Sequence, residues 1–215
     1  MKYSKLLRLQ CPLVLSHLLE TANKFTENPA ESSGPAISSP PVAWFVLRVT
    51  YQREVITKQQ LDELGVENFL PIRHVRKRNR QGRFFYADEV AVHNYIFVRT
   101  TRDTIDGLKH GRLPWLRYVM ANNSDGKRIL TVPEREMQNF IAVAGNTEQQ
   151  ILFLNPVETM LEPGDRVRVL GGAFEGVEGC FVRLKGQHLR RVVVRIEGVV
   201  AVATTTIPAR LVEKI

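Results

Sequence analysis

Cysteine and long apolar runs are both scarce in this chain. Two cysteines in 215 residues cannot build a disulfide framework, and Cys11 and Cys180 are too far apart to form a CxxC pair. No window approaches the ~20 apolar residues that a membrane-spanning helix needs. The leucine-rich stretch 1–19 is interrupted by Arg8 and Pro12, and no A-x-A cleavage site follows it. We therefore expect a cytoplasmic protein without membrane contact.

The sequence also lacks the patterns of an enzyme. It has no G-x-S-x-G motif, no phosphate-binding loop and no recognisable pair of catalytic carboxylates. The five histidines are scattered and show no metal-ligand spacing. We expect no catalytic residues, no metal and no cofactor.

Acidic residues are outnumbered, 22 against 30 Lys and Arg, which gives a net charge of +8. Such an excess favours a polyanionic partner, although a basic protein without one remains the alternative. The charge is concentrated in residues 73–83, where six of eleven residues are Lys or Arg and none is acidic. Because each phosphate contact adds salt-dependent affinity, we expect nucleic-acid contact here; the alternative is a solvated basic hairpin. The six residues are Arg73, Arg76, Lys77, Arg78, Arg80 and Arg83.

Composition predicts four segments. Residues 27–41 are rich in Pro, Ser and Gly and cannot bury enough apolar surface to fold, so 1–41 is predicted to be an amphipathic extension and linker. A first domain is expected over 42–145. Polar and turn-forming residues predict a second linker over 146–160, followed by a second domain over 161–215.

The middle segment alternates strand and helix signals. Strands are predicted at 42–50, 68–75, 83–92, 95–99, 116–120 and 128–132, with 79–82 as a hairpin tip. Helices are predicted over 51–64, ending at Gly65, over 101–110, and from Pro133, where Met137, Phe140 and Ile141 share one face. The pattern predicts an α+β sandwich, with helices against an antiparallel sheet.

The last segment predicts only strands, at 167–170, 177–184, 192–196 and 199–203. Eleven of the sixteen residues from Val192 to Ile207 are Val, Ile or Thr, whose branched side chains favour strands. Four to five short strands in about 55 residues favour a small β-barrel.

Motifs in both predicted domains resemble the NusG family of transcription factors. Residues 163–169 and 172–179 resemble the KOW motif of an SH3-like barrel, with Gly172, Gly176 and Gly179 at its tight turns and close backbone approaches. Residues 44–47, 94–98 and 131–137 resemble, in order, the opening strand, the tyrosine-bearing strand and the last helix of the NusG amino-terminal domain. The resemblance implies a ferredoxin-like α/β sandwich followed by the barrel, in a monomeric protein.

The resemblance also implies a partner. In the NusG family, the amino-terminal domain binds the clamp helices of the largest RNA polymerase subunit through an apolar patch. Tyr95 is the central candidate, flanked by Val92 and Phe97, with Trp44 behind; a core role for all four is the alternative. Beside a polymerase, the basic hairpin would meet non-template DNA or nascent RNA. His93-Asn94 replaces the family's usual Pro-Gly before the tyrosine.

KOW domains of this family recruit ribosomal protein S10 or the termination factor Rho. The corresponding contact in this chain is Ile196-Glu197, where a charge replaces an aromatic residue, which argues against both partners and most against Rho. The long extension and the basic hairpin resemble a specialised antiterminator of the UpxY group, which implies read-through of long operons such as those for polysaccharide synthesis. The alternative function is a ribosome-associated KOW protein that binds RNA.

Overall fold

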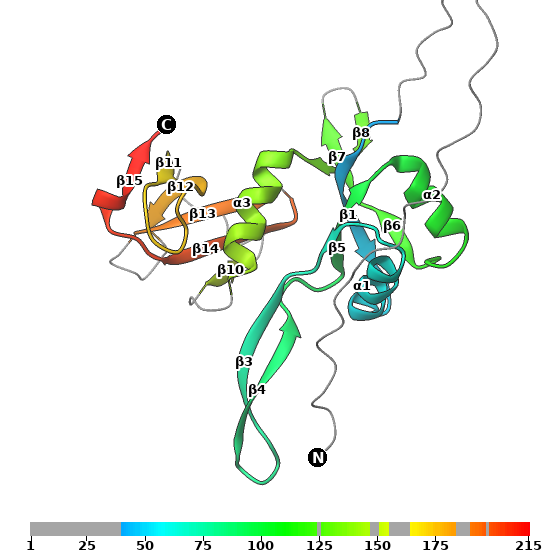
Figure 1. The fold of residues 1–215 in the computed structure, drawn as a ribbon, viewed down its shortest axis with the longest axis horizontal. Helices are drawn as coiled ribbons and strands as arrows, with labels where there is room; N and C mark the ends of the chain where they lie inside the picture. Colours follow the sequence, from blue (N-terminus) through cyan, green and yellow to red (C-terminus); the bar gives the residue numbers. More distant parts are fainter. Residues whose placement is uncertain (1–39, 124–125, 147–150, 155–163, 184–189, 197) are drawn as a thin grey trace, which may run out of the picture. The chain divides into compact units, whose positions relative to one another are not determined.

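The computed structural model describes residues 40–123, 126–146, 151–154, 164–183, 190–196 and 198–215. The predicted extension up to residue 39, with Cys11, lies outside the described residues, as do Glu197 and much of the predicted linker 146–160. Within the described part are two larger antiparallel sheets, two separate hairpins and three α-helices (Figure 1).

The first sheet has the strand order β2-β5-β1-β6, and β9 also pairs with β1. All of its pairings are antiparallel. Its members are β1 (Ala43–Val49), β2 (Asn68–Phe69), β5 (Tyr95–Thr100), β6 (Leu116–Tyr118) and β9 (Thr131–Val132). β1 lies in the middle of the sheet and is buried along most of its length, which confirms the buried strand predicted there.

Helices pack on both faces of this sheet. Successive side chains of β1 point to opposite sides, so this strand contributes to a core on each face. Phe45 and Leu47 join the core that contains Leu61 of α1 (Glu54–Glu63) and Ile105 of α2 (Arg102–His110). Trp44 and Val46 join the core that contains Met137 and Phe140 of α3 (Glu134–Ala144). The predicted sandwich of helices against an antiparallel sheet is thus observed.

Local signals account for the helix ends. Thr101 precedes α2, and its hydroxyl accepts a hydrogen bond from the backbone N–H of Thr104, as in a typical N-cap. Gly65 follows α1 with φ of +66°, the conformation that glycine tolerates best. α1 begins at Glu54, three residues later than predicted, because Tyr51 and Gln52 take left-handed backbone angles that no helix contains. Pro133 precedes α3 and is its N-cap residue, not its first helical residue as predicted.

Two hairpins stand apart from the larger sheets. The first joins β3 (Ile72–Arg78) and β4 (Phe84–Val90), as predicted, and projects away from the sheet in Figure 1. The second joins β7 (Met120–Asn123) and β8 (Gly126–Ile129). The predicted strands 116–120 and 128–132 are therefore each divided between the first sheet and this hairpin.

The second sheet has the order β10-β14-β13-β12-β11-β15. Its strands are β10 (Leu152–Leu154), β11 (Asp165–Val169), β12 (Glu178–Arg183), β13 (Arg190–Ile196), β14 (Val200–Thr206) and β15 (Val212–Lys214). Four of them were predicted, and β10 lies inside the range predicted to be a linker. Over the described residues, the pairing forms an open path with β10 and β15 at its ends, not a closed barrel.

Candidate functional site

Three cross-strand pairs form a row on the α3 side of the first sheet. The register of β1 against β5 sets Trp44 opposite Arg99, Val46 opposite Phe97, and Arg48 opposite Tyr95. Directly opposed residues of an antiparallel pair point to the same face, so these six side chains line one surface. The sequence-predicted residues Trp44, Phe97 and Tyr95 are thereby brought together.

Helix α3 covers the middle of this row. The Phe97 ring lies 5.3 Å from the ring of Phe140 and 6.5 Å from that of Phe69, measured between centroids. Phe97 is fully buried, and Trp44 is 3% exposed. In this structure, both residues are part of the core between sheet and helix.

Tyr95 lies at the end of the row that α3 leaves less covered. Its side chain is half-buried against the same apolar cluster that contains Val92, whereas the neighbouring Arg48 is exposed. Of the four residues predicted to bind polymerase, Tyr95 is therefore the one that offers most surface to a partner. Val92 is buried, at 9% exposure, and belongs to that cluster.

A tight turn before Tyr95 fixes its position. Asn94 has φ of +66°, a left-handed conformation that asparagine tolerates better than most residues with a Cβ atom. Asn94 thus takes the backbone conformation that a glycine would adopt there. The Asn94 N–H donates to the buried carboxylate of Glu54 at 2.7 Å, and the Asn94 carbonyl accepts from the Val49 N–H at 2.8 Å. These bonds connect the turn to α1 and β1.

The opposite end of the row carries an exposed charge network. Arg99 donates to Glu134 at 3.1 Å and to Glu67 at 3.2 Å. The hydrogen bond from Arg99 lowers the pKa of Glu134 below its ordinary value, and the two carboxylates raise the pKa of Arg99. Because these groups are exposed, solvent screens the pairs and they add little to stability.

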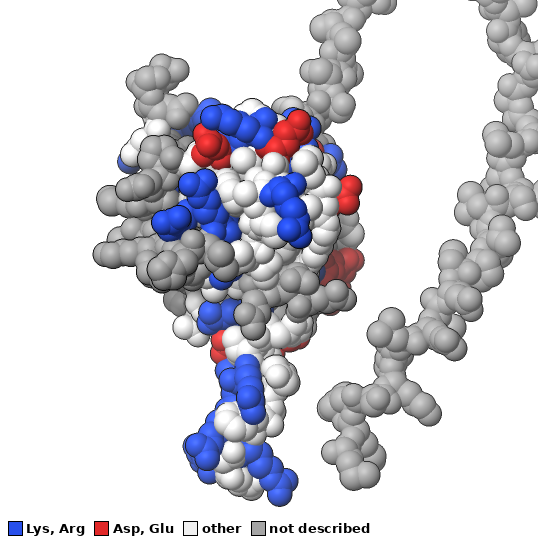
Figure 2. Space-filling model, turned by 90° about the vertical axis from the view of Figure 1, so that its left-hand side faces the viewer, with Lys and Arg blue, Asp and Glu red and all other residues white. Residues whose placement is uncertain are grey.

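On the β3–β4 hairpin, two of the six predicted basic residues have acidic partners. Glu89 accepts from Lys77 at 2.6 Å and from Arg73 at 3.3 Å. The hydrogen bond from Lys77, together with the charges of both residues, lowers the pKa of Glu89. Among the described residues, no acidic group pairs with the remaining four, so their charge is available to a ligand (Figure 2). They are Arg76, Arg78, Arg80 and Arg83.

Sequence reasoning missed three aromatic residues on the same hairpin. Phe84, Phe85 and Tyr86 are 59%, 45% and 75% exposed. Large aromatic side chains are normally buried, so three adjacent exposed ones are unusual. The signal in the sequence was the run of three adjacent aromatic residues in a strand predicted to belong to a hairpin. A two-stranded hairpin that stands apart has no sheet or helix to cover its faces, so these side chains stay exposed.

The second sheet gives less access to its predicted contact. Ile196 is 2% exposed, and Glu197 lies outside the described residues. Glu178 of β12 is buried and accepts from Arg168 at 2.7 Å and from Arg135 of α3. Cys180 is a free cysteine, half-buried in β12.

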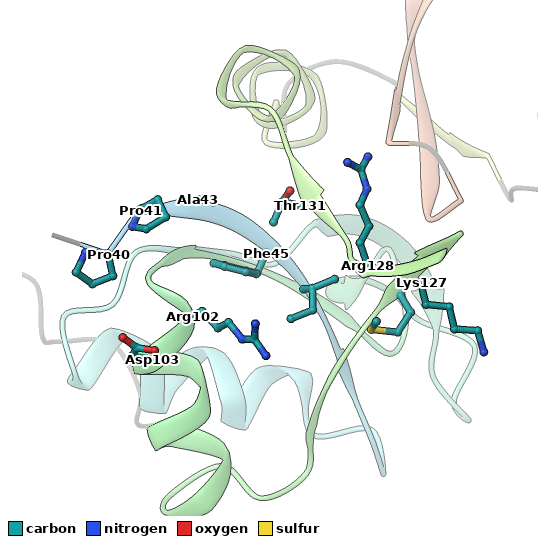
Figure 3. A pocket seen from close by; sticks show the side chains of 11 residues that line it. Pro40, Pro41, Ala43, Phe45, Arg102, Asp103, Lys127, Arg128 and Thr131 are labelled. Atoms are coloured by element: carbon teal, nitrogen blue, oxygen red, sulfur yellow. The ribbon is translucent and has the colours of Figure 1, made fainter. Parts of the chain in front are cut away.

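A cavity of about 700 Å³ lies beside the start of β1 (Figure 3). Its walls combine apolar side chains such as Phe45 and Ile129 with the cations Arg102, Lys127 and Arg128. None of the sequence-predicted site residues lines it. Within the described ranges, no group of His, Cys, Asp and Glu side chains is arranged to hold a metal ion, and no helix has the length and apolar character to cross a membrane.

Comparison with known proteins identifies the first domain. Residues 42–141, slightly under half of the chain, match the family model described as transcription termination factor nusG. This segment is therefore a NusG-family domain. A solved structure titled "Domain interaction in Thermotoga maritima NusG" is similar, with 21% identity, a TM-score of 0.41, and coverage of 81% of this chain and 98% of that one. No curated protein matches the chain in sequence.

Proposed function

We propose that this protein is a transcription elongation and antitermination factor that binds RNA polymerase through the face around Tyr95. The NusG-family domain over residues 42–141 carries the proposal. The strand order of the first sheet, with α1 and α2 on one face, supports the ferredoxin-like arrangement expected of that domain.

The chemistry of the face suits an amphipathic helix of the polymerase clamp. Tyr95 offers a ring beside the cation of Arg48, and it packs against the apolar cluster that includes Val92. An aromatic anchor with a polar rim is a common arrangement at binding hot spots. Trp44 and Phe97 act from within the core, where they hold Tyr95 at the surface.

The second sheet supports a KOW domain. Gly172 and Gly176 have φ of +88° and +81°, as tight turns require. Val167 and Val169 alternate into the core, as the resemblance implies. Because a charge stands where the family has an aromatic contact, we propose that this domain does not recruit Rho and that the factor promotes read-through of particular long operons.

Binding of the full-length chain to nucleic-acid-free bacterial RNA polymerase tests the central proposal. Tyr95→Ala is expected to weaken binding about 30-fold, since a hot-spot residue contributes roughly 2 kcal/mol or more. Tyr95→Phe retains the ring and is expected to bind nearly as well as the original chain.

Tyr86→Ala is the matched control, because it removes an exposed tyrosine from the hairpin and leaves the sheet unchanged. Equal loss in the two alanine variants would contradict the assignment of the face. Failure of the unmodified chain to bind polymerase would refute the proposal, and RNA binding without polymerase binding would favour a ribosome-associated role.

A further inference from the structure

The two faces of the β3–β4 hairpin differ in their chemistry. The register sets Arg76 opposite Tyr86, Arg78 opposite Phe84, and Lys77 opposite Phe85. Since neighbouring residues of a strand point to opposite faces, Arg76, Arg78, Phe84 and Tyr86 share one face, which we call the stacking face. Arg73, Lys77, Phe85 and Glu89 share the other, the ion-paired face.

On the ion-paired face the charges are already satisfied, because Glu89 accepts from both Lys77 and Arg73. The stacking face also carries His74 and Asp88, which pair with each other. Among the described residues, no salt bridge joins Arg76 or Arg78 to an acidic group. Both arginines contact Phe84 on the same face. The Arg76 guanidinium lies 3.9 Å from the Phe84 ring centroid, and the Arg78 guanidinium lies 5.8 Å from it. Phe84 is therefore held in place by arginine.

Tyr86 is the exception on the stacking face. It is 75% exposed, and within the described part of the chain its ring contacts no other aromatic ring or cation. It is two residues from Phe84 on the same strand, about 6.6 Å along it. An exposed flat ring beside guanidinium groups that have no acidic partner is the chemistry that binds a nucleobase and its phosphate together.

We propose that the stacking face binds single-stranded nucleic acid, with a base stacked on Tyr86 and the backbone phosphates held by the arginines around it. Arg80 and Arg83 lie in the turn between β3 and β4, and Figure 2 shows Lys and Arg side chains along the hairpin as far as its tip. This inference rests on the proposed function only for where the single-stranded nucleic acid comes from, which would be the DNA or RNA beside the polymerase. It assigns base contact to aromatic residues, in addition to the phosphate contact expected of the basic residues.

The test uses the full-length chain without polymerase, so that its result is independent of polymerase binding. Fluorescence anisotropy would measure affinity for labelled oligothymidylate and oligouridylate of about 12 nucleotides, a length within the usual range of single-strand sites. An abasic strand with the same number of phosphates and a DNA duplex are the comparison probes. Tighter binding of the DNA or of the RNA strand would identify which source the face prefers, and either result supports the proposal.

The unmodified chain is expected to bind the base-bearing strands more tightly than the abasic strand. Tyr86→Ala is expected to weaken binding of base-bearing strands about 5- to 150-fold, the range for losing one stacked base, and to leave abasic binding and the salt dependence unchanged. Tyr86→Phe retains the stacking ring and is expected to retain affinity. Arg80→Ala is expected to reduce the slope of log affinity against log salt by about 0.7.

Phe85→Ala is the matched control, because it removes an exposed ring from the ion-paired face of the same strand. Equal affinity of the unmodified chain for abasic and base-bearing strands would overturn the proposal without any variant. So would equal losses in Phe85→Ala and Tyr86→Ala. If Tyr86→Ala weakened binding to nucleic-acid-free polymerase and not to oligonucleotides, the face would be a protein contact and the proposal would be wrong.

Discussion

Substitutions at Asn94 test how the turn before Tyr95 is held. A left-handed backbone costs an ordinary residue with a Cβ atom about 1–2 kcal/mol, and asparagine less because its side chain can hydrogen-bond locally. Glycine adopts this conformation without that cost. We therefore expect Asn94→Ala to lower the free energy of unfolding by about 1 kcal/mol, and Asn94→Gly to change it by less than about 0.5 kcal/mol.

The chain offers a suitable probe for this measurement. Its two tryptophans, Trp44 and Trp115, both lie in the NusG-family domain, so urea unfolding followed by their fluorescence reports on that domain. For a slope of about 1–3 kcal/mol per molar urea, a loss of 1 kcal/mol moves the midpoint by about 0.3–1 M. The Asn94→Gly midpoint should stay near that of the original chain.

Glu54 provides a second, independent variant of the same turn. Glu54→Ala removes the acceptor for the Asn94 N–H and is expected to cost about 1–3 kcal/mol, whereas Glu54→Gln retains an acceptor oxygen and should cost less. If Asn94→Gly were as destabilising as Asn94→Ala, or more so, the left-handed backbone at Asn94 would not be what limits the choice of residue, and the reasoning would be refuted.

Three further variants probe the core, the second sheet and a half-buried phenol. Phe140→Ala should lower the free energy of unfolding by about 3–5 kcal/mol, because the ring is fully buried; urea unfolding checks this. Gly179→Ala should destabilise the second sheet by about 1–3 kcal/mol, since a Cβ atom would lie 2.6 Å from the Val193 carbonyl oxygen; loss of amide exchange protection in β12 and β13 would show it. Burial and a hydrogen bond to Asp106 raise the pKa of Tyr118 to about 12. The folded state therefore favours the protonated phenol, so stability should fall as the pH rises from about 10 towards 12, and Tyr118→Phe should flatten that fall.

Local sequence was sufficient for most of the secondary structure. The apolar run of β1 and the β-branched density of β13 and β14 each act within a few residues, so pattern alone predicted these strands. The short strands β10 and β15 were missed because three residues carry little periodicity. Their pairing with β14 and β11 depends on segments distant in the chain.

The composition of the candidate sites was also present in the sequence, but their accessibility was decided by the tertiary structure. Tyr95 and Phe97 share one face of β5, and only the packing of α3 buries one ring fully and leaves the other half-exposed. The basic run was visible from its residues, whereas the register of the hairpin decided that Lys77 is neutralised and Arg76 lies against an aromatic ring. Burial and pairing are relations between residues far apart in the chain, so they follow from the fold and not from local pattern.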